Sequence, residues 1–172
     1  MKIRPLLFLL TAQFLWTPAA WADSENLLPL TFANFQSSLT KEFNKNAARY
    51  PITLDSCLKG DGDKRSACTF KIGDFMVVTI ESLKGEQDVV GMTMICAAKD
   101  QLDNAKCLIA YISAMSIAAS DTNIEQRSKI LKLLIEGLAV GNSTTISTSE
   151  RKFTLQKSLG LWFHIYAFDI PD

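Results

Sequence analysis

The sequence predicts an α+β protein, with one antiparallel sheet of about five to six strands and helices packed on one face of that sheet. Apolar residues recur at helical spacing in three segments, and the chain between the first and second of these alternates between apolar and polar residues, as strands do. A second alternating stretch follows the third segment. Because strands and helices come in separate runs, we expect one helix, three or four strands, two helices, and two or three strands in place of alternating βαβ units.

The first helix is expected to follow Thr31, whose hydroxyl makes it a good N-cap residue. The apolar stripe of this helix consists of Phe32, Phe35, Leu39 and Phe43. Pro51 cannot continue a helix, so extended chain should begin near that residue.

Short alternating segments between residues 52 and 98 predict an antiparallel meander. The alternating apolar residues of its first hairpin are Ile52, Leu54, Leu58, Cys68, Phe70 and Ile72. A charged, turn-rich loop at 60–65 separates the two halves of this hairpin. Two more strands are expected near 75–82 and 89–98, on either side of a turn at 84–88.

The chain beyond residue 100 predicts two helices followed by strands. The expected buried stripes are Leu108, Ile112, Met115 and Ala119 for the first helix, and Ile130, Leu131, Leu134 and Leu138 for the second. Thr122 and Glu125 have the spacing of a capping box, which predicts where the second helix begins. Residues 143–148 form either a strand edge or a loop, and strands are expected over 152–156 and 161–168.

Residues 1–22 have the three parts of a secretory signal peptide. Basic residues precede an apolar run at 6–15, and the small-residue site Ala20-Trp21-Ala22 follows. Cleavage after Ala22 would leave residues 23–172 as a single domain. We therefore expect a periplasmic or secreted protein that does not insert in a membrane after signal removal, since no later stretch approaches about 18 unbroken apolar residues.

All four cysteines lie in the expected mature part, which predicts two disulfides in an exported protein. The pairs Cys57–Cys68 and Cys96–Cys107 have equal, short separations, so we favour them over the two other connectivities. Cys57 has the opposite strand parity to Ile52, so its pairing with Cys68 requires a β-bulge or a loop position. Cysteine pairs at zinc-ligand spacing are absent from the sequence, so no metal is expected.

Composition and motifs give little support for catalysis. Eighteen basic residues balance eighteen acidic residues, so net charge does not favour nucleic acid or an anionic membrane as partner. The sequence lacks the glycine-rich phosphate loops, the G-x-S-x-G elbow and the H-E-x-x-H zinc motif. Asp61 and Asp63 precede two basic residues, which is typical of a solvated loop. We expect no cofactor, and the absence of these motifs makes a non-enzymatic protein the favoured class.

The segment 161–168 holds the residues at which we expect binding. In a strand, one face of this segment carries Trp162, His164, Tyr166 and Phe168, and the other face is also apolar. The simpler interpretation is that the strand is central and that a helix, such as the one at 32–43, or a loop covers the second face as core. The alternative is that these aromatic residues form an open platform for a partner. His164 is the only histidine, and a hydrogen-bonded strand residue is the simpler role for it.

Three functional hypotheses follow, in this order. The first is a non-enzymatic exported protein that binds another protein, such as an inhibitor, an immunity-type protein or an envelope accessory protein. The second is a carrier of a small apolar ligand, which requires a cavity lined by the apolar residues. The third is a small hydrolase that uses carboxylates or a serine with His164.

Overall fold

The computed structural model describes residues 27–60, 65–83, 89–98, 100–120, 122–158 and 160–167. The expected signal peptide at 1–22, the loop residues Asp61 and Asp63, and Phe168 lie outside these ranges. The described chain forms three helices and one seven-stranded antiparallel sheet, which confirms the predicted α+β class.

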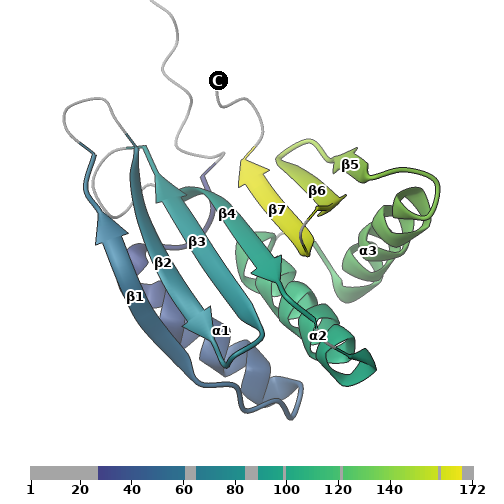
Figure 1. The fold of residues 1–172 in the computed structure, drawn as a ribbon. Coiled ribbons are helices and arrows are strands. Elements are labelled where there is room, and N and C mark those ends of the chain that lie inside the picture. Colours follow the sequence, from purple (N-terminus) through teal and green to yellow (C-terminus); the bar gives the residue numbers. More distant parts are fainter. Residues whose placement is uncertain are drawn as a thin grey trace, which may run out of the picture.

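The elements occur in the order α-β-β-β-β-α-α-β-β-β. Their bounds are α1 Phe32–Lys45, β1 Ile52–Leu58, β2 Ser66–Ile72, β3 Met76–Ser82, β4 Val89–Cys96, α2 Gln101–Ala118, α3 Ile124–Leu138, β5 Ser143–Ser147, β6 Arg151–Lys157 and β7 Leu161–Ala167. Within the sheet the order is β1-β2-β3-β4-β7-β6-β5, so β4 and β7 are neighbours although they are far apart in the sequence (Figure 1). The sheet has more strands than predicted because the meander contains four and the segment at 143–147 forms an edge strand.

The main core lies between the helices and one face of the sheet (Figure 1). Phe35 of α1 contacts Phe70 of β2 with ring centroids 4.7 Å apart, and Tyr111 of α2 contacts Phe163 of β7 at 4.9 Å. Helix α3 packs against β5 and β6, where Thr144 of β5 points toward it. The three helices of the described chain therefore cover the same face of the sheet, as predicted.

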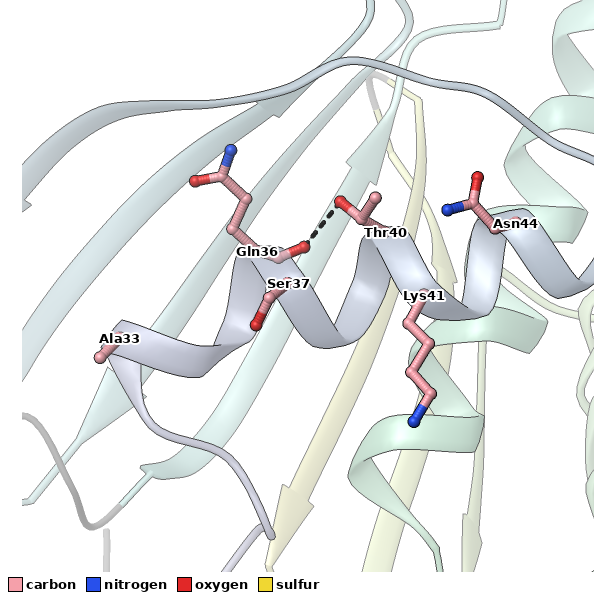
Figure 2. A pocket seen from close by; sticks show the side chains of 6 residues that line it. All are labelled: Ala33, Gln36, Ser37, Thr40, Lys41 and Asn44. Atoms are coloured by element: carbon pink, nitrogen blue, oxygen red, sulfur yellow. Dashed lines mark hydrogen bonds between the residues drawn. The ribbon is translucent and has the colours of Figure 1, made fainter.

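Helix α1 is amphipathic, with Thr31 as its N-cap. The Thr31 hydroxyl accepts from the Asn34 amide at 3.1 Å, and the Asn34 side chain accepts from the Thr31 amide at 2.8 Å. Its fully buried residues are Phe35, Leu39 and Phe43. On the outward side of α1, which carries short polar residues (Figure 2), the Gln36 side chain donates to the Ile52 carbonyl at 2.8 Å. This bond fixes the start of β1 against α1.

Strand β1 departs from the predicted alternation. Ile52 is buried, but Leu54 and Leu58 are 56% and 74% exposed. These two side chains are exposed because β1 is an edge strand that pairs only with β2 among the described strands. A β-bulge between Leu54 and Ser56 also shifts the register within the strand.

Helix α2 is present as predicted, but its buried stripe differs. Ile112 is exposed and Leu108 is only half-buried. The buried residues are Cys107, Ala110, Tyr111, Ser113, Ala114, Met115 and Ala118. Most of the surface of α2 is apolar, so the spacing of apolar residues alone does not define its rotation. The disulfide from Cys107 to Cys96 and the hydrogen bond from Tyr111 to Leu161, both to the sheet, define the rotation of α2 instead.

Helix α3 begins one residue later than its predicted capping box. The Asn123 side chain accepts from the Gln126 amide at 2.9 Å, and the Gln126 side chain accepts from the Asn123 amide at 2.9 Å. The Thr122 hydroxyl instead donates to the Ala119 carbonyl at 2.7 Å. An Asn…Gln pair therefore takes the role that was predicted for Thr122 and Glu125.

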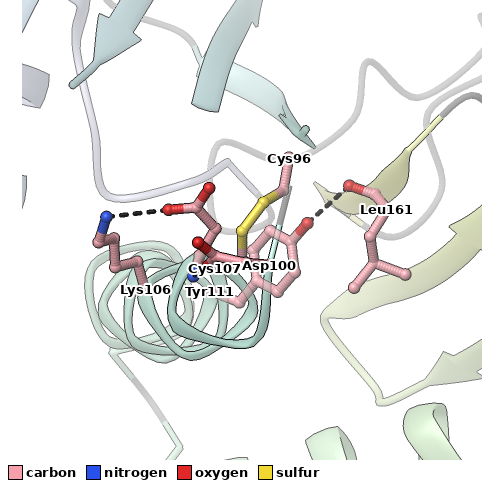
Figure 3. Close-up of a disulfide and its surroundings, with 7 residues drawn as sticks. Cys96, Asp100, Lys106, Cys107, Tyr111 and Leu161 are labelled. Atoms are coloured by element: carbon pink, nitrogen blue, oxygen red, sulfur yellow. Dashed lines mark hydrogen bonds and ion pairs between the residues drawn. A yellow bond between two sulfur atoms is a disulfide. The ribbon is translucent and has the colours of Figure 1, made fainter. Parts of the chain in front are cut away.

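Both predicted disulfides are present. Cys57 and Cys68 are directly opposed on β1 and β2, and the bulge between Leu54 and Ser56 supplies the shift in parity that this pairing requires. Cys96 at the end of β4 joins Cys107 in the second turn of α2 (Figure 3). One bridge therefore closes the β1–β2 hairpin, and the other joins the sheet to the helix layer.

Arg151 connects three separate parts of the chain. It is only 4% exposed, and its guanidinium donates to the carbonyls of Ala118 at 3.1 Å, Leu27 at 3.1 Å and Glu150 at 2.8 Å. Ala118 is the last residue of α2, so the charge also lies at the negative end of that helix dipole.

None of the helices in the described ranges is long and apolar enough to cross a membrane.

Candidate functional site

Strand β7 lies between β4 and β6, so its two faces have different surroundings. Phe163 and Ile165 point into the core beneath the helices and are fully buried. Trp162, His164 and Tyr166 point to the opposite face and are half-buried. The predicted cover of this second face by the helix at 32–43 does not occur, because α1 packs against the same face of the sheet as Phe163. We refer to Trp162, His164 and Tyr166 as the aromatic strip.

A row of hydroxyl groups crosses the sheet at the level of His164. Strand pairing aligns one residue from each of six neighbouring strands. Five of them are threonines, which we call the hydroxyl row, and His164 lies between Thr93 and Thr154; the threonines are Thr69, Thr79, Thr93, Thr154 and Thr145. Within the row, the side-chain oxygens of Thr69 and Thr79 are 3.3 Å apart and those of Thr145 and Thr154 are 2.9 Å apart. The face opposite the helices therefore carries ordered polar groups on both sides of the aromatic strip.

A chain of hydrogen bonds links the strip to a carboxylate on β3. Thr93 Oγ1 lies 3.0 Å from His164 Nδ1 and 3.1 Å from the Tyr166 hydroxyl, which lies 3.4 Å from Glu81 Oε1. An ionised carboxylate only accepts hydrogen bonds, so Tyr166 donates to Glu81. Thr93 then donates to Tyr166 and accepts from the Nδ1–H of His164. This arrangement uses every donor once and assigns the Nδ1–H tautomer to neutral His164.

The three rings of the strip form a continuous surface. The ring centroids of Trp162 and His164 are 6.1 Å apart, as are those of His164 and Tyr166, and the latter two planes differ by 17°. Tyr166 also covers Gly91, its cross-strand partner on β4, since a Cβ at Gly91 would lie 2.3 Å from the Tyr166 ring. The absence of a side chain at Gly91 thus lets the tyrosine ring lie against the sheet.

The strip is uncharged near neutral pH. Burial lowers the pKa of His164 below its usual 6.5, and the Glu81 carboxylate opposes this shift only in part. Burial likewise raises the pKa of Tyr166. At the end of the hydrogen-bond chain, Glu81 is also paired with Arg65 at 3.5 Å.

The indole nitrogen of Trp162 is a buried polar atom of the strip without a hydrogen bond in the described residues. Nε1 is buried and has no acceptor within the residues that the structure describes. A buried N–H without an acceptor is costly, so Trp162 keeps an unmet hydrogen bond among the described residues. Phe168, the fourth predicted binding residue, lies outside the described ranges.

The face opposite the helices presents contact area and hydrogen-bonding groups. All four cysteines are paired, so no thiolate is free. Within the described ranges, no group of three or more histidine, cysteine or acidic side chains is placed to hold a metal. The face offers flat aromatic area, threonine hydroxyls and methyl groups, and one carboxylate near its edge.

Two further hollows lie elsewhere on the described surface. The hollow on α1 is lined by Ala33, Gln36, Ser37, Thr40, Lys41 and Asn44 (Figure 2). It has the small polar side chains of an ordinary outward helix surface, and the Thr40 hydroxyl is used within α1, donating to the Gln36 carbonyl at 2.8 Å. A second hollow lies beside the Cys96–Cys107 bridge, where the Tyr111 hydroxyl donates to the Leu161 carbonyl at 2.6 Å (Figure 3). The second hollow is lined by apolar residues such as Ala97, Leu138 and Leu161 as well as by polar residues such as Asn104 and Lys157.

No protein family model, curated protein or solved structure matches the chain. A function for this chain is therefore inferred from its own geometry.

The sequence identified the aromatic strip but not the residues that support it. Thr93, Glu81 and Gly91 come from strands β3 and β4, and their contacts with β7 depend on a pairing between segments distant in the sequence. The one available signal was the glycine within an otherwise strand-like segment, because an isolated glycine in a strand often marks a close approach by another group.

Proposed function

We propose that the protein is exported and binds another protein through the sheet face that carries the aromatic strip. The observation that supports this most directly is the position of Trp162, His164 and Tyr166 on the face opposite the three described helices. Tryptophan and tyrosine are enriched at binding hot spots because they offer large, rigid contact area together with a polar tip. The hydroxyl row would surround this contact with groups that can bond a partner.

The residues suit a protein partner better than a charged ligand. The strip is neutral near pH 7, and the neighbouring threonines offer methyl groups as well as hydroxyls. Tryptophan also has the largest apolar ring surface of the three strip residues, and such residues dominate binding hot spots. We therefore place Trp162 at the centre of the contact.

Export is supported by the signal-like pattern at 1–22 and by the two disulfides, which are compatible with an oxidising compartment. The intact mass of protein recovered from the exported fraction tests this part. The expected mass lacks residues 1–22 and lacks two hydrogens for each disulfide. A full-length mass, or a protein that reacts with a thiol reagent in denaturant, would contradict export.

Site-specific photo-cross-linking in the cells of origin tests the binding face. A photoreactive amino acid at position 162 should form adducts of defined mass with another protein, and these adducts should weaken when Tyr166 is replaced by Ala. The matched control carries the same amino acid at position 41, since Lys41 is exposed on the outward side of α1. Adducts that are the same at both positions, or only small-molecule adducts at position 162, would overturn the proposal.

A further inference from the structure

The two edges of the sheet are protected to different extents. On β1, a bulge follows Leu54, and Asp55 forms an ion pair with Lys71. Strand β5, with the sequence STTIS, has no charged residue, proline or glycine, and its register with β6 shows no shift. Natural sheets normally use charges, prolines or bulges to prevent a further strand from pairing at an edge. Strand β5 lacks these features and so is suited to accept another strand.

Backbone hydrogen bonds at the ends of β5 show which groups face outward. Lys157 donates to the Asn142 carbonyl at 2.8 Å, and Thr148 donates to the Arg151 carbonyl at 2.8 Å. Hydrogen-bonded and non-hydrogen-bonded pairs alternate along an antiparallel ladder, so the even-numbered residues of β5 bond to β6. The residues whose amide and carbonyl groups point away from β6 are Ser143, Thr145 and Ser147.

We propose that β5 pairs with β5 of a second copy across a two-fold axis at Thr145, giving a homodimer with one continuous sheet. Thr145 then opposes the partner's Thr145, and Ser143 opposes the partner's Ser147. These are the residues whose backbone groups face outward, so each opposed pair can exchange two hydrogen bonds. No charge lies within the segment to oppose this pairing. The pairing also carries the hydroxyl row from one copy into the other, since Thr145 is the last residue of that row.

Helix α3 has an apolar flank that this dimer would cover. A Cβ at Gly137 would lie 2.4 Å from the Thr144 side chain, so this side of α3 faces the edge strand. Leu133 lies four residues before Gly137, which places it on the same side of the helix, and Val140 follows shortly after the helix ends at Leu138. They are 44% and 92% exposed. An aliphatic pair this exposed, beside an unprotected edge, is what a partner subunit would bury.

The spacing of the helices agrees with this arrangement. Helix α3 packs against both β5 and β6, so two copies of α3 would be separated by about two strand spacings, roughly 10 Å. Packed helices have interaxial distances of about 8–10 Å. Leu133 and Val140 would therefore fill the contact between the two helices.

Charge variants at the axis test the homodimer by sedimentation of the mature, oxidised protein. Wild type should sediment as a dimer, and Thr145→Lys and Thr145→Glu should each weaken the dimer by roughly 100-fold or more, because like charges oppose each other across the axis. An equimolar mixture of these two variants should recover a dimer. Thr154→Lys, on the neighbouring internal strand, is the matched control and should remain dimeric.

Thr145→Pro provides a second variant that tests the backbone pairing. Proline removes an outward amide that β6 does not use, so the fold should persist, with an unchanged circular dichroism spectrum, while the dimer is lost. Wild type that stays monomeric up to roughly 100 µM, or a Thr145→Pro variant that stays dimeric, would overturn the proposal. Sedimentation does not involve the aromatic strip, so failure here would leave the proposed protein-binding face standing.

Discussion

The ring of Tyr166 lies across the backbone of Gly91, and a Cβ at that glycine would approach the ring to 2.3 Å. Gly91→Ala should therefore displace the tyrosine and lower the free energy of unfolding by about 1–3 kcal/mol, the usual cost of overpacking. Urea unfolding provides the measurement. Gly141→Ala is the matched control, because its nearest neighbour would lie at 3.8 Å, and it should change stability little. If Gly91→Ala is equally destabilising in a Tyr166→Ala background, the ring is not the cause.

Replacing Trp162 and Tyr166 together by Ala should leave most of the stability intact, because both side chains are only half-buried. Phe163→Ala, on the buried face of the same strand, should cost about 3–5 kcal/mol. Thermal unfolding compares the two variants directly. A double variant that is as unstable as Phe163→Ala would show that the strip is part of the core and not a free binding surface.

Stability should fall as pH drops through the region where His164 titrates. Its folded pKa lies below the usual 6.5, so the unfolded chain takes up the proton first and the folded state loses stability as pH falls from about 7 toward the folded pKa. His164→Gln removes this contribution. The difference in unfolding free energy between wild type and His164→Gln should therefore shift with pH in favour of the variant as the solution becomes more acidic. A difference that is constant between about pH 7.5 and 5.5 would contradict the lowered pKa.

The two disulfides should be reduced in a fixed order. Cys57 is exposed at the sheet edge, whereas Cys96 and Cys107 are each 1% exposed. A reductant reaches an exposed sulfur first, so mass spectrometry of alkylated peptides should find Cys57 and Cys68 modified before the other pair. Simultaneous reduction of both bridges would indicate that global unfolding precedes any attack.

Arg151→Met should destabilise the protein by at least about 2 kcal/mol, because buried carbonyl groups then lose their donor. Methionine keeps much of the side-chain volume, so the effect reports on hydrogen bonding more than on packing. Lys152→Met, at the next residue of β6 and exposed, is the control and should be near neutral. Chemical denaturation of both variants checks the difference. Equal stability of the two would show that the guanidinium bonds contribute little.

Local patterns were sufficient to predict much of the fold. The parity conflict at Cys57 predicted a bulge or a loop position, and the structure has a bulge between Leu54 and Ser56. The rotation of α2 was not predictable in the same way, since a helix that is apolar on most sides has no single stripe, and Ile112 is accordingly exposed. The start of α3 was misplaced by one residue because Thr122 and Asn123 can both cap a helix.

The aromatic strip was predictable only in part. Alternation placed Trp162, His164 and Tyr166 on one face, but both faces of that segment are apolar, so the sequence could not decide which face the helices cover. The partners Thr93 and Glu81 were missed because they reach the strip through the pairing of β4 with β7, which joins residues more than sixty positions apart. Local periodicity contains no information about such a pairing.

The pairing of β4 with β7 also has a kinetic consequence. Strands β1–β4 are joined by short links, and so are β5–β7, whereas β4 and β7 meet only after the long segment containing α2 and α3 has been closed. Closing such a loop loses chain entropy before any contact compensates for it, so this junction is expected to form late in folding. Thr93 stands on one side of the junction and His164 on the other. The hydrogen bond between them can therefore form only after the two halves of the sheet have joined, and a refolding signal from Trp162 would report that last step.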